Sequence, residues 1–159
     1  MKELVGIAEP IAAKLIARKQ TIAVAESSTG GLISASLLAV PGASAYFLGG
    51  GVVYTRDARR VLMDIPDEAM KGIRSASEPY AKLLAEQVRR RFATDWGLSE
   101  TGATGPTGNR YGDAAGHSCM AVAGAATTVI TLETGSSDRQ GNMHEFAKTA
   151  LNLLLKKLG

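Results

Sequence analysis

Residues 21–31 read Thr-Ile-Ala-Val-Ala-Glu-Ser-Ser-Thr-Gly-Gly, and this stretch decides how the chain folds. Its first half is a short apolar run, which predicts a buried strand over 21–25. The amphipathic run 32–38, Leu-Ile-Ser-Ala-Ser-Leu-Leu, follows directly and predicts a helix. A strand that ends in three hydroxyl residues and two glycines, and then opens a helix, gathers nucleophilic side chains and backbone N–H groups at one place. We expect the chemistry of the protein to lie there.

The rest of the chain alternates in the same way between helical and strand patterns. Helices are predicted over about 2–19, 29–39, 56–63, 77–94 and 137–158, and strands over about 21–25, 49–55, 96–101, 117–123 and 126–133. The last helix is expected to open with a capping box, Ser137-Asp138-Arg139-Gln140. This order, with one late hairpin, predicts an α/β protein built as a three-layer α/β/α sandwich around a mixed, mostly parallel sheet. Residues 1–159 are expected to form a single domain.

The composition is that of an ordinary soluble globular chain. Of its 159 residues 45% are hydrophobic and 21% charged, and no apolar run approaches the roughly 20 residues of a membrane helix. The N-terminus lacks the pattern of a signal peptide, so we expect a cytoplasmic protein that does not bind a membrane. Cys119 is the only cysteine, which excludes an intrachain disulfide and a cysteine-rich zinc site.

The net charge of +3 raises the question of a nucleic-acid partner. The basic clusters Arg59-Arg60, Arg89-Arg90-Arg91 and Lys156-Lys157 all fall in predicted helices, where a solvated polar face explains them. We therefore expect no nucleic-acid partner. A small ligand that carries a phosphate would suit the same charge balance.

Two segments could carry the chemistry, and each has a structural explanation as well. Ser27, Ser28 and Thr29 could simply cap a helix. Two glycines inside a helix would cost about 1 kcal/mol each relative to alanine, and close approach of the backbone to an anion would offset that cost. The segment 100–113 follows a predicted strand, as ligand loops in open α/β sheets do, but a flexible surface loop fits equally well. It contains neither a Walker motif nor a dinucleotide-binding glycine motif.

Several motifs in the right order resemble a known family. They are Ala25-Glu26-Ser27-Ser28-Thr29-Gly30-Gly31, the run 40–50 from Val-Pro-Gly-Ala-Ser to Leu-Gly-Gly, Tyr54-Thr55, and Thr101-Gly102-Ala103-Thr104-Gly105-Pro106. Over residues 5–158 the chain looks like the CinA C-terminal domain of the competence/damage-inducible proteins. The resemblance implies a nicotinamide-nucleotide amidase, which hydrolyses nicotinamide mononucleotide to nicotinate mononucleotide and ammonia in pyridine nucleotide recycling. It implies no cofactor and no metal.

The resemblance also implies roles for individual residues. Ser27 would be the nucleophile that forms an acyl-enzyme, and Thr101 occupies a hydroxyl position that faces the site. Backbone N–H groups around Thr29, Gly30 and Gly31 would hold the oxyanion or the phosphate. Three more residues complete the expected substrate-binding set: Ser28, Gly102, and Arg139, whose guanidinium could meet the phosphate with two hydrogen bonds.

The chain departs from the family where the partner of the nucleophile is expected. The family pattern reads Tyr-Ser-Asn-x-x-Lys, and its lysine takes the proton of the serine, whereas this chain has Arg56 and Arg59 at the last two defined positions. Arginine stays protonated, so Arg59 cannot inherit that role. It could bind a phosphate or a carboxylate, or form a structural ion pair with Asp57 or Glu26. Three residues remain as candidate bases by motif position: Glu26, Tyr54 and His117.

Three functional hypotheses follow. The first is a metal-independent amidohydrolase with a small nucleotide substrate, and the alternative is a nucleotide-binding module of the same fold that has lost hydrolysis. A structural or partner-binding domain is the third. His117 and Cys119 share one face of a predicted strand, which favours packing over a metal site. The apolar faces of the first and last helices could pack internally or against another subunit, so a homo-oligomer stays open.

Overall fold

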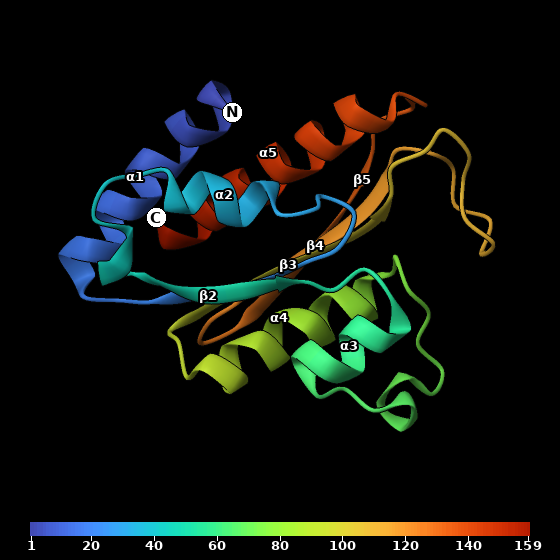
Figure 1. Cartoon of the computed structure of the whole chain (residues 1–159), viewed down its shortest axis with the longest axis horizontal. Coiled ribbons are helices and arrows are strands. Elements are labelled where there is room, and N and C mark those ends of the chain that lie inside the picture. Colours follow the sequence, from blue (N-terminus) through green and yellow to red (C-terminus); the bar gives the residue numbers. More distant parts are fainter.

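A five-stranded sheet lies at the centre of the computed structural model, which describes residues 1–159 (Figure 1). The strands are β1 (Ile22–Glu26), β2 (Phe47–Val52), β3 (Trp96–Ala103), β4 (His117–Ala123) and β5 (Thr127–Glu133), in the spatial order β2-β1-β3-β4-β5. β1 pairs in parallel with β2 and β3, whereas the β3/β4 and β4/β5 pairs are antiparallel. Four strands therefore run in one direction and β4 runs against them, which confirms the mixed sheet.

Helices cover both faces of this sheet, as Figure 1 shows. One layer holds α1 (Lys2–Arg18), α2 (Leu32–Leu38) and α5 (Arg139–Leu158), and the other holds α3 (Arg56–Met63) and α4 (Glu78–Phe92). Two 3-10 turns, at Ala43–Ala45 and Asp67–Met70, complete the structure. The prediction of a three-layer α/β/α sandwich is confirmed. No helix is both long enough and apolar enough to cross a bilayer.

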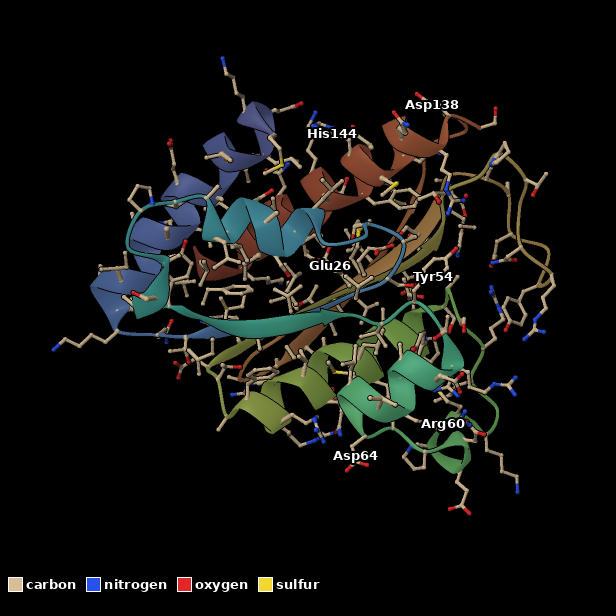
Figure 2. The ribbon with its side chains drawn as sticks, viewed as in Figure 1. Glu26, Tyr54, Arg60, Asp64, Asp138 and His144 are labelled. Atoms are coloured by element: carbon tan, nitrogen blue, oxygen red, sulfur yellow. The ribbon has the colours of Figure 1, made fainter.

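The alternation of side chains along β1 divides the core between the two layers. Ile22 and Val24 belong to the larger core, under α1, α2 and α5, whereas Ala23 and Ala25 belong to the core under α4. Glu26 follows Val24 by two residues, so its carboxylate points toward the α2 layer, as Figure 2 shows. A fully buried carboxylate thus ends the strand that leads into the hydroxyl residues.

The same alternation separates two polar residues on β3. Glu100 lies on the α2 and α5 side with Leu98, which belongs to the larger core. Ser99 and Thr101 point to the other side, where Ser99 donates a hydrogen bond to the Ala81 carbonyl of α4. The polar residues of this strand therefore point to opposite faces of the sheet.

Some predicted boundaries were wrong for local reasons. α2 begins at Leu32 rather than near 29, since Gly30 and Gly31 take left-handed φ values of 63° and 102°. The expected capping box at Ser137 does not form. α5 has Asp138 as its N-cap with no side-chain cap, and the Asp138 N–H donates to the Ser136 hydroxyl instead.

Candidate functional site

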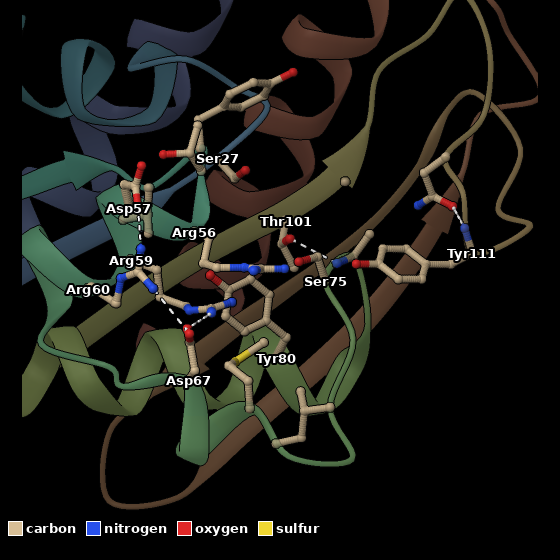
Figure 3. A pocket seen from close by; sticks show the side chains of 18 of the residues that line it. Ser27, Arg56, Asp57, Arg59, Arg60, Asp67, Ser75, Tyr80, Thr101 and Tyr111 are labelled. Atoms are coloured by element: carbon tan, nitrogen blue, oxygen red, sulfur yellow. Dashed lines mark hydrogen bonds and ion pairs between the residues drawn. The ribbon is translucent and has the colours of Figure 1, made fainter.

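The main cleft, with a volume of about 950 Å³, opens at the carboxyl ends of β1 and β3 (Figure 3). Ser27, which directly follows β1, and Thr101, which lies on β3, both line it. Its walls come from the segments 53–60, 67–80 and 109–111. Ligand sites in open α/β sheets lie at this edge, because loops from neighbouring parallel strands meet there.

The structure distinguishes the three hydroxyl residues of the opening motif. The Ser28 hydroxyl donates to Glu100 Oε1 at 2.5 Å, and the Thr29 hydroxyl lies 2.7 Å from Glu26 Oε1. The Ser27 hydroxyl makes no hydrogen bond within the chain, and Ser27 alone of the three lines the main cleft. Only Ser27 is therefore both free and placed to meet a ligand there.

The Glu26 carboxylate fills the N-terminus of α2. It accepts the backbone N–H groups of Gly31 at 2.8 Å, Ile33 at 3.1 Å and Ser34 at 2.9 Å, together with the Ser34 hydroxyl at 2.7 Å. A helix N-terminus attracts anions, and here the chain supplies its own. The expected anion-binding role of the Gly31 N–H is corrected accordingly, because that group is already engaged inside the protein.

A second buried carboxylate holds the same corner from β3. Glu100 Oε2 accepts the backbone N–H groups of Ser27 at 3.1 Å and Thr29 at 3.0 Å, and the Ser118 hydroxyl donates to Oε1 at 3.1 Å. The Gly30 N–H donates to the Ser27 carbonyl. The N–H groups of Thr29 and Gly30 are thus also engaged in hydrogen bonds within the protein, like that of Gly31. Complete burial raises the pKa of Glu100, and these hydrogen bonds oppose the rise.

The glycine pair has a backbone explanation. Gly30 and Gly31 both occupy the left-handed region that side chains rarely adopt. A Cβ atom on Gly31 would meet only Val52, at an ordinary contact distance of 3.9 Å, so space for a ligand does not require glycine there. The sharp turn at the two glycines lets the first N–H groups of α2 donate to Glu26. The glycines are therefore explained by the backbone, and the expectation that they make room for a ligand is corrected.

Arg59 is buried, which contradicts the prediction of a solvated basic face on this helix. Arg59 and Met63 lie one turn apart on α3 and form its inner face. The Arg59 side chain donates from Nη2 to Asp67 Oδ1 at 3.0 Å, rather than to Asp57 or Glu26. Its Nε is buried without any hydrogen-bond partner. An unpaired buried donor of this kind costs about 1–3 kcal/mol.

His117, on β4, points to the face of the sheet opposite the one that Glu100 faces, and it supports a wall of the cleft. Its Nε2 lies 2.7 Å from the carbonyl oxygen of Ala76, which lines the cleft, and its Nδ1 contacts Glu133. Both partners are acceptors, so the imidazolium form satisfies both nitrogens. Burial lowers the pKa of His117, but the bonds to Glu133 and Ala76 outweigh it and the pKa is raised. His117 therefore supports the site and does not line the cleft.

Thr101 and Ala76 join the floor of the cleft to its wall. Thr101 Oγ1 accepts the Ala76 N–H at 3.1 Å, which leaves the proton of the Thr101 hydroxyl free to reach a ligand. Figure 3 shows Thr101 beside the cleft with Ser27. The structure thus brings these two predicted site residues together.

A smaller hollow of about 230 Å³ adjoins the main cleft and contains the other predicted binding residues. Ser28, Gly102 and Arg139 line it, and Tyr54 and Gly102 line both spaces. Arg139 donates from Nη1 to the Gly105 carbonyl at 2.5 Å, and its Nη2 lies 3.4 Å from the Tyr54 hydroxyl. Arg139 therefore lines a different space from Ser27, and the exposed side chain of Tyr54 borders both spaces.

Several lining residues were missed from the sequence. Tyr80 is buried in the cleft wall, and burial raises its pKa while the neighbouring Arg59 opposes the rise. Its spacing to Leu84 on the apolar face of α4 is the only sequence signal, and that signal indicates packing. Asp67 lies in a segment to which sequence patterns assign no site, whereas Arg110 lies in the candidate ligand loop 100–113 but was not itself predicted as a site residue.

The chain is similar to known proteins over nearly its whole length. The CinA C-terminal domain family matches residues 5–158. A CinA-like protein of Gloeobacter violaceus is 36% identical over 154 residues, which cover 96% of this chain and 36% of that protein. A CinA-like protein of an Anaeromyxobacter species is 38% identical over 92% of this chain and 36% of its own length. The chain thus spans about a third of the length of these curated relatives.

Solved structures agree with this match. The chain is similar to a competence-damaged protein (CinA) superfamily protein from Enterobacter cloacae, with a TM-score of 0.90, 26% identity and coverage of 98% of this chain and 92% of that one. It is also similar to the competence/damage inducible protein CihA from Agrobacterium tumefaciens, with a TM-score of 0.89, 25% identity and coverage of 97% and 94%.

Proposed function

Because this chain belongs to the CinA C-terminal domain family, we propose that it hydrolyses the carboxamide of nicotinamide mononucleotide through Ser27. The products are nicotinate mononucleotide and ammonia. The observation that carries the proposal is the Ser27 hydroxyl, which is free of internal hydrogen bonds and lines a cleft of about 950 Å³. Its two hydroxyl neighbours are engaged by buried carboxylates.

The fixed backbone of Ser27 suits a nucleophile. Glu100 accepts the Ser27 and Thr29 N–H groups, so the residue is held from behind by a fully buried side chain. The Ser28 N–H donates to no group of the chain. The N–H that follows a nucleophile is a common donor to the oxyanion of acyl-transfer reactions, and Ser28 could supply it here.

The reaction then takes two steps. Ser27 Oγ attacks the carboxamide carbon and gives up its proton, and the tetrahedral intermediate expels ammonia, which carries that proton away. A water molecule then attacks the acyl-enzyme, the bond to Ser27 Oγ breaks, and the carboxylate product leaves; one proton of the water returns to Ser27 Oγ and the other passes to solvent. The ammonia nitrogen comes from the substrate and the new oxygen from water, so no redox partner is needed.

Tyr54 is the remaining candidate for the proton acceptor. Glu26 is enclosed by its hydrogen bonds at α2, and His117 is held between Glu133 and Ala76. Tyr54 lines the cleft with Ser27, and its hydroxyl lies 3.4 Å from Arg139 Nη2. Of the three candidate bases, Tyr54 alone lines the cleft with Ser27.

Arg59 favours a second candidate function. Arg59 occupies the position of the family lysine, and an arginine cannot serve as the base there because its side chain stays protonated. A cleft of this kind would bind a nucleotide without hydrolysing it. The chain would then be a nucleotide-binding module of the same fold.

One experiment separates the two candidates. The purified chain is incubated at high concentration with nicotinamide mononucleotide, and ammonia and nicotinate mononucleotide are followed beside Ser27→Ala. Product formed by the parent chain and abolished in Ser27→Ala supports the amidase. Binding of nicotinamide mononucleotide by calorimetry with no product would reject the amidase and support the module.

A further inference from the structure

We propose that Arg59 and Arg60 form an anion-binding site that Asp67 occupies in the free protein, and that a phosphate or carboxylate of a ligand displaces Asp67 there. The proposal concerns binding alone and holds whether or not Ser27 turns a substrate over. It gives a role to the arginine that stands in place of the family lysine.

Asp67 bridges the two arginines with its two oxygens. Oδ1 lies 3.0 Å from Arg59 Nη2, and Oδ2 lies 3.1 Å from Arg60 Nη1. Figure 3 shows the Asp67 carboxylate between the two guanidinium groups. An anionic group with two or more oxygens bound by two guanidinium groups is the arrangement in which proteins hold phosphates and carboxylates. All three residues line the main cleft.

The Asp67 side chain is a weakly held occupant. It is 56% exposed and lies at the start of a 3-10 turn, and no group other than the two arginines hydrogen-bonds to it. Water solvates the Asp67 carboxylate on its exposed side, which screens its attraction to the two guanidinium groups. The Asp67 carboxylate can therefore turn into solvent at small cost when another anion takes its place.

Arg59 has a donor that Asp67 leaves unused. Its side chain is more than nine-tenths buried, and Nε is without a hydrogen-bond partner. Departure of Asp67 releases the guanidinium to turn, so that Nε and Nη2 together can meet the oxygens of one ligand group. A two-bond contact of this kind satisfies the buried donor, which the single contact with Asp67 does not.

The charge of the cleft favours such an exchange. Four arginines line it, namely Arg56, Arg59, Arg60 and Arg110, against two carboxylates, Asp57 and Asp67. Arg56 and Arg110 form no ion pair. The lining thus keeps an excess of positive charge even with both carboxylates in place, and this field attracts an anionic ligand.

The chain offers a matched control for the test. Asp57 also lines the cleft and pairs with Arg60, but it does not contact Arg59. Asp67→Asn and Asp57→Asn therefore remove the same charge from the same cleft, and only the first removes the occupant of the proposed site. Binding of inorganic phosphate to the full chain is measured for both variants by calorimetry at constant ionic strength.

We expect Asp67→Asn to tighten phosphate binding about tenfold, which corresponds to about 1.4 kcal/mol. Asp57→Asn should change it by less than about threefold, as expected for an exposed charge. Equal tightening in both variants would overturn the proposal, since a general field would then explain the result. Unchanged binding in Asp67→Asn would overturn it as well.

A double variant tests the contribution of Arg60. Arg60→Gln in the Asp67→Asn background should abolish the gain, and Arg60 is exposed enough for this chain to keep its fold. Nicotinate, which offers only a carboxylate, and nicotinamide mononucleotide, which offers only a phosphate, then identify the group that is bound. These titrations are repeated in Ser27→Ala, so a failed amidase and a failed anion site give different results.

Discussion

Glu100 Oε2 accepts the backbone N–H of Ser27 at 3.1 Å, from a strand 73 residues farther along the chain. The contact leaves the Ser27 hydroxyl untouched and fixes the backbone that carries it. The other Glu100 oxygen takes the Ser28 hydroxyl at 2.5 Å. One buried carboxylate thus binds the hydroxyl of Ser28 and leaves the hydroxyl of Ser27 free.

Ser27→Ala is expected to lower kcat for nicotinamide mononucleotide hydrolysis on the order of 10³-fold or more, because the attacking oxygen is lost. Ser28→Ala is the matched control. It should keep kcat within about tenfold while unfolding more easily, since Glu100 loses a buried hydrogen bond worth about 1–3 kcal/mol. A steady-state ammonia assay and urea unfolding measure the two effects. Similar losses of kcat in both variants would contradict the assignment of Ser27.

Arg59→Lys tests the proton acceptor. A lysine in a cleft can lose its proton, whereas an arginine cannot, so the variant should raise kcat by orders of magnitude if the missing base limits the reaction. Arg90→Lys, on the exposed face of α4 and outside the cleft, provides the comparison. An unchanged rate in Arg59→Lys would show that the base is elsewhere.

Glu26→Gln is expected to destabilise the fold by about 2–4 kcal/mol. Glu26 is fully buried and accepts hydrogen bonds only, and the NH2 group of glutamine would face donors such as the Ser34 N–H. Urea unfolding followed by circular dichroism gives the change in free energy. Glu9→Gln on the exposed face of α1 should shift that free energy by less than about 0.5 kcal/mol. Equal stability of the two variants would refute the structural role of Glu26.

Because of His117, the free energy of unfolding of the protein is expected to fall as the pH rises. Its pKa is raised in the folded protein, where burial lowers it less than the bonds to Glu133 and Ala76 raise it. The stabilisation is therefore complete below the ordinary histidine value of about 6.5 and is lost as the pH rises through the folded pKa. Unfolding free energies between about pH 5.5 and 9 should show this loss in the parent chain and in His144→Gln. The same pH dependence in His117→Gln would contradict its assignment to His117.

Gly102→Ala should damage both stability and the site. A Cβ atom there would lie 2.7 Å from the His117 carbonyl oxygen and from the side chain of Ser118, so β3 and β4 would be forced apart beside the cleft. We expect a loss of about 1–3 kcal/mol. Gly6→Ala in α1, where a Cβ atom meets nothing within 4 Å, should instead stabilise the chain by about 1 kcal/mol. Thermal unfolding of the two variants distinguishes these opposite signs.

Local patterns were sufficient for most of the fold. The apolar run before Glu26 and the hairpin around Gly124 predicted strands where β1, β4 and β5 lie, and α3 was predicted with the observed bounds. These elements follow from periodicity and turn residues, which are properties of neighbouring positions. The boundary of α2 was wrong because its start depends on two left-handed glycines, of which Gly31 donates its N–H to Glu26.

The environment of a charged group was much harder to predict. Arg59 reads as part of a basic helix surface, yet it is buried because α3 turns its Arg59 and Met63 face inward. Its partner Asp67 lies in a segment without any regular pattern. Tyr80 reads as a core residue and also lines the cleft.

By itself the sequence determined the order of elements, the three-layer arrangement and the family, because these depend on residues close together and on motifs in a fixed order. Only the tertiary structure decided which of the hydroxyl residues at 27–29 is free, and that the chain's own Glu26 fills the N-terminus of α2. Those outcomes depend on Glu100 and other groups brought together by strand pairing. Hydrogen bonds and ion pairs act over a few ångströms in space, whatever the separation along the chain.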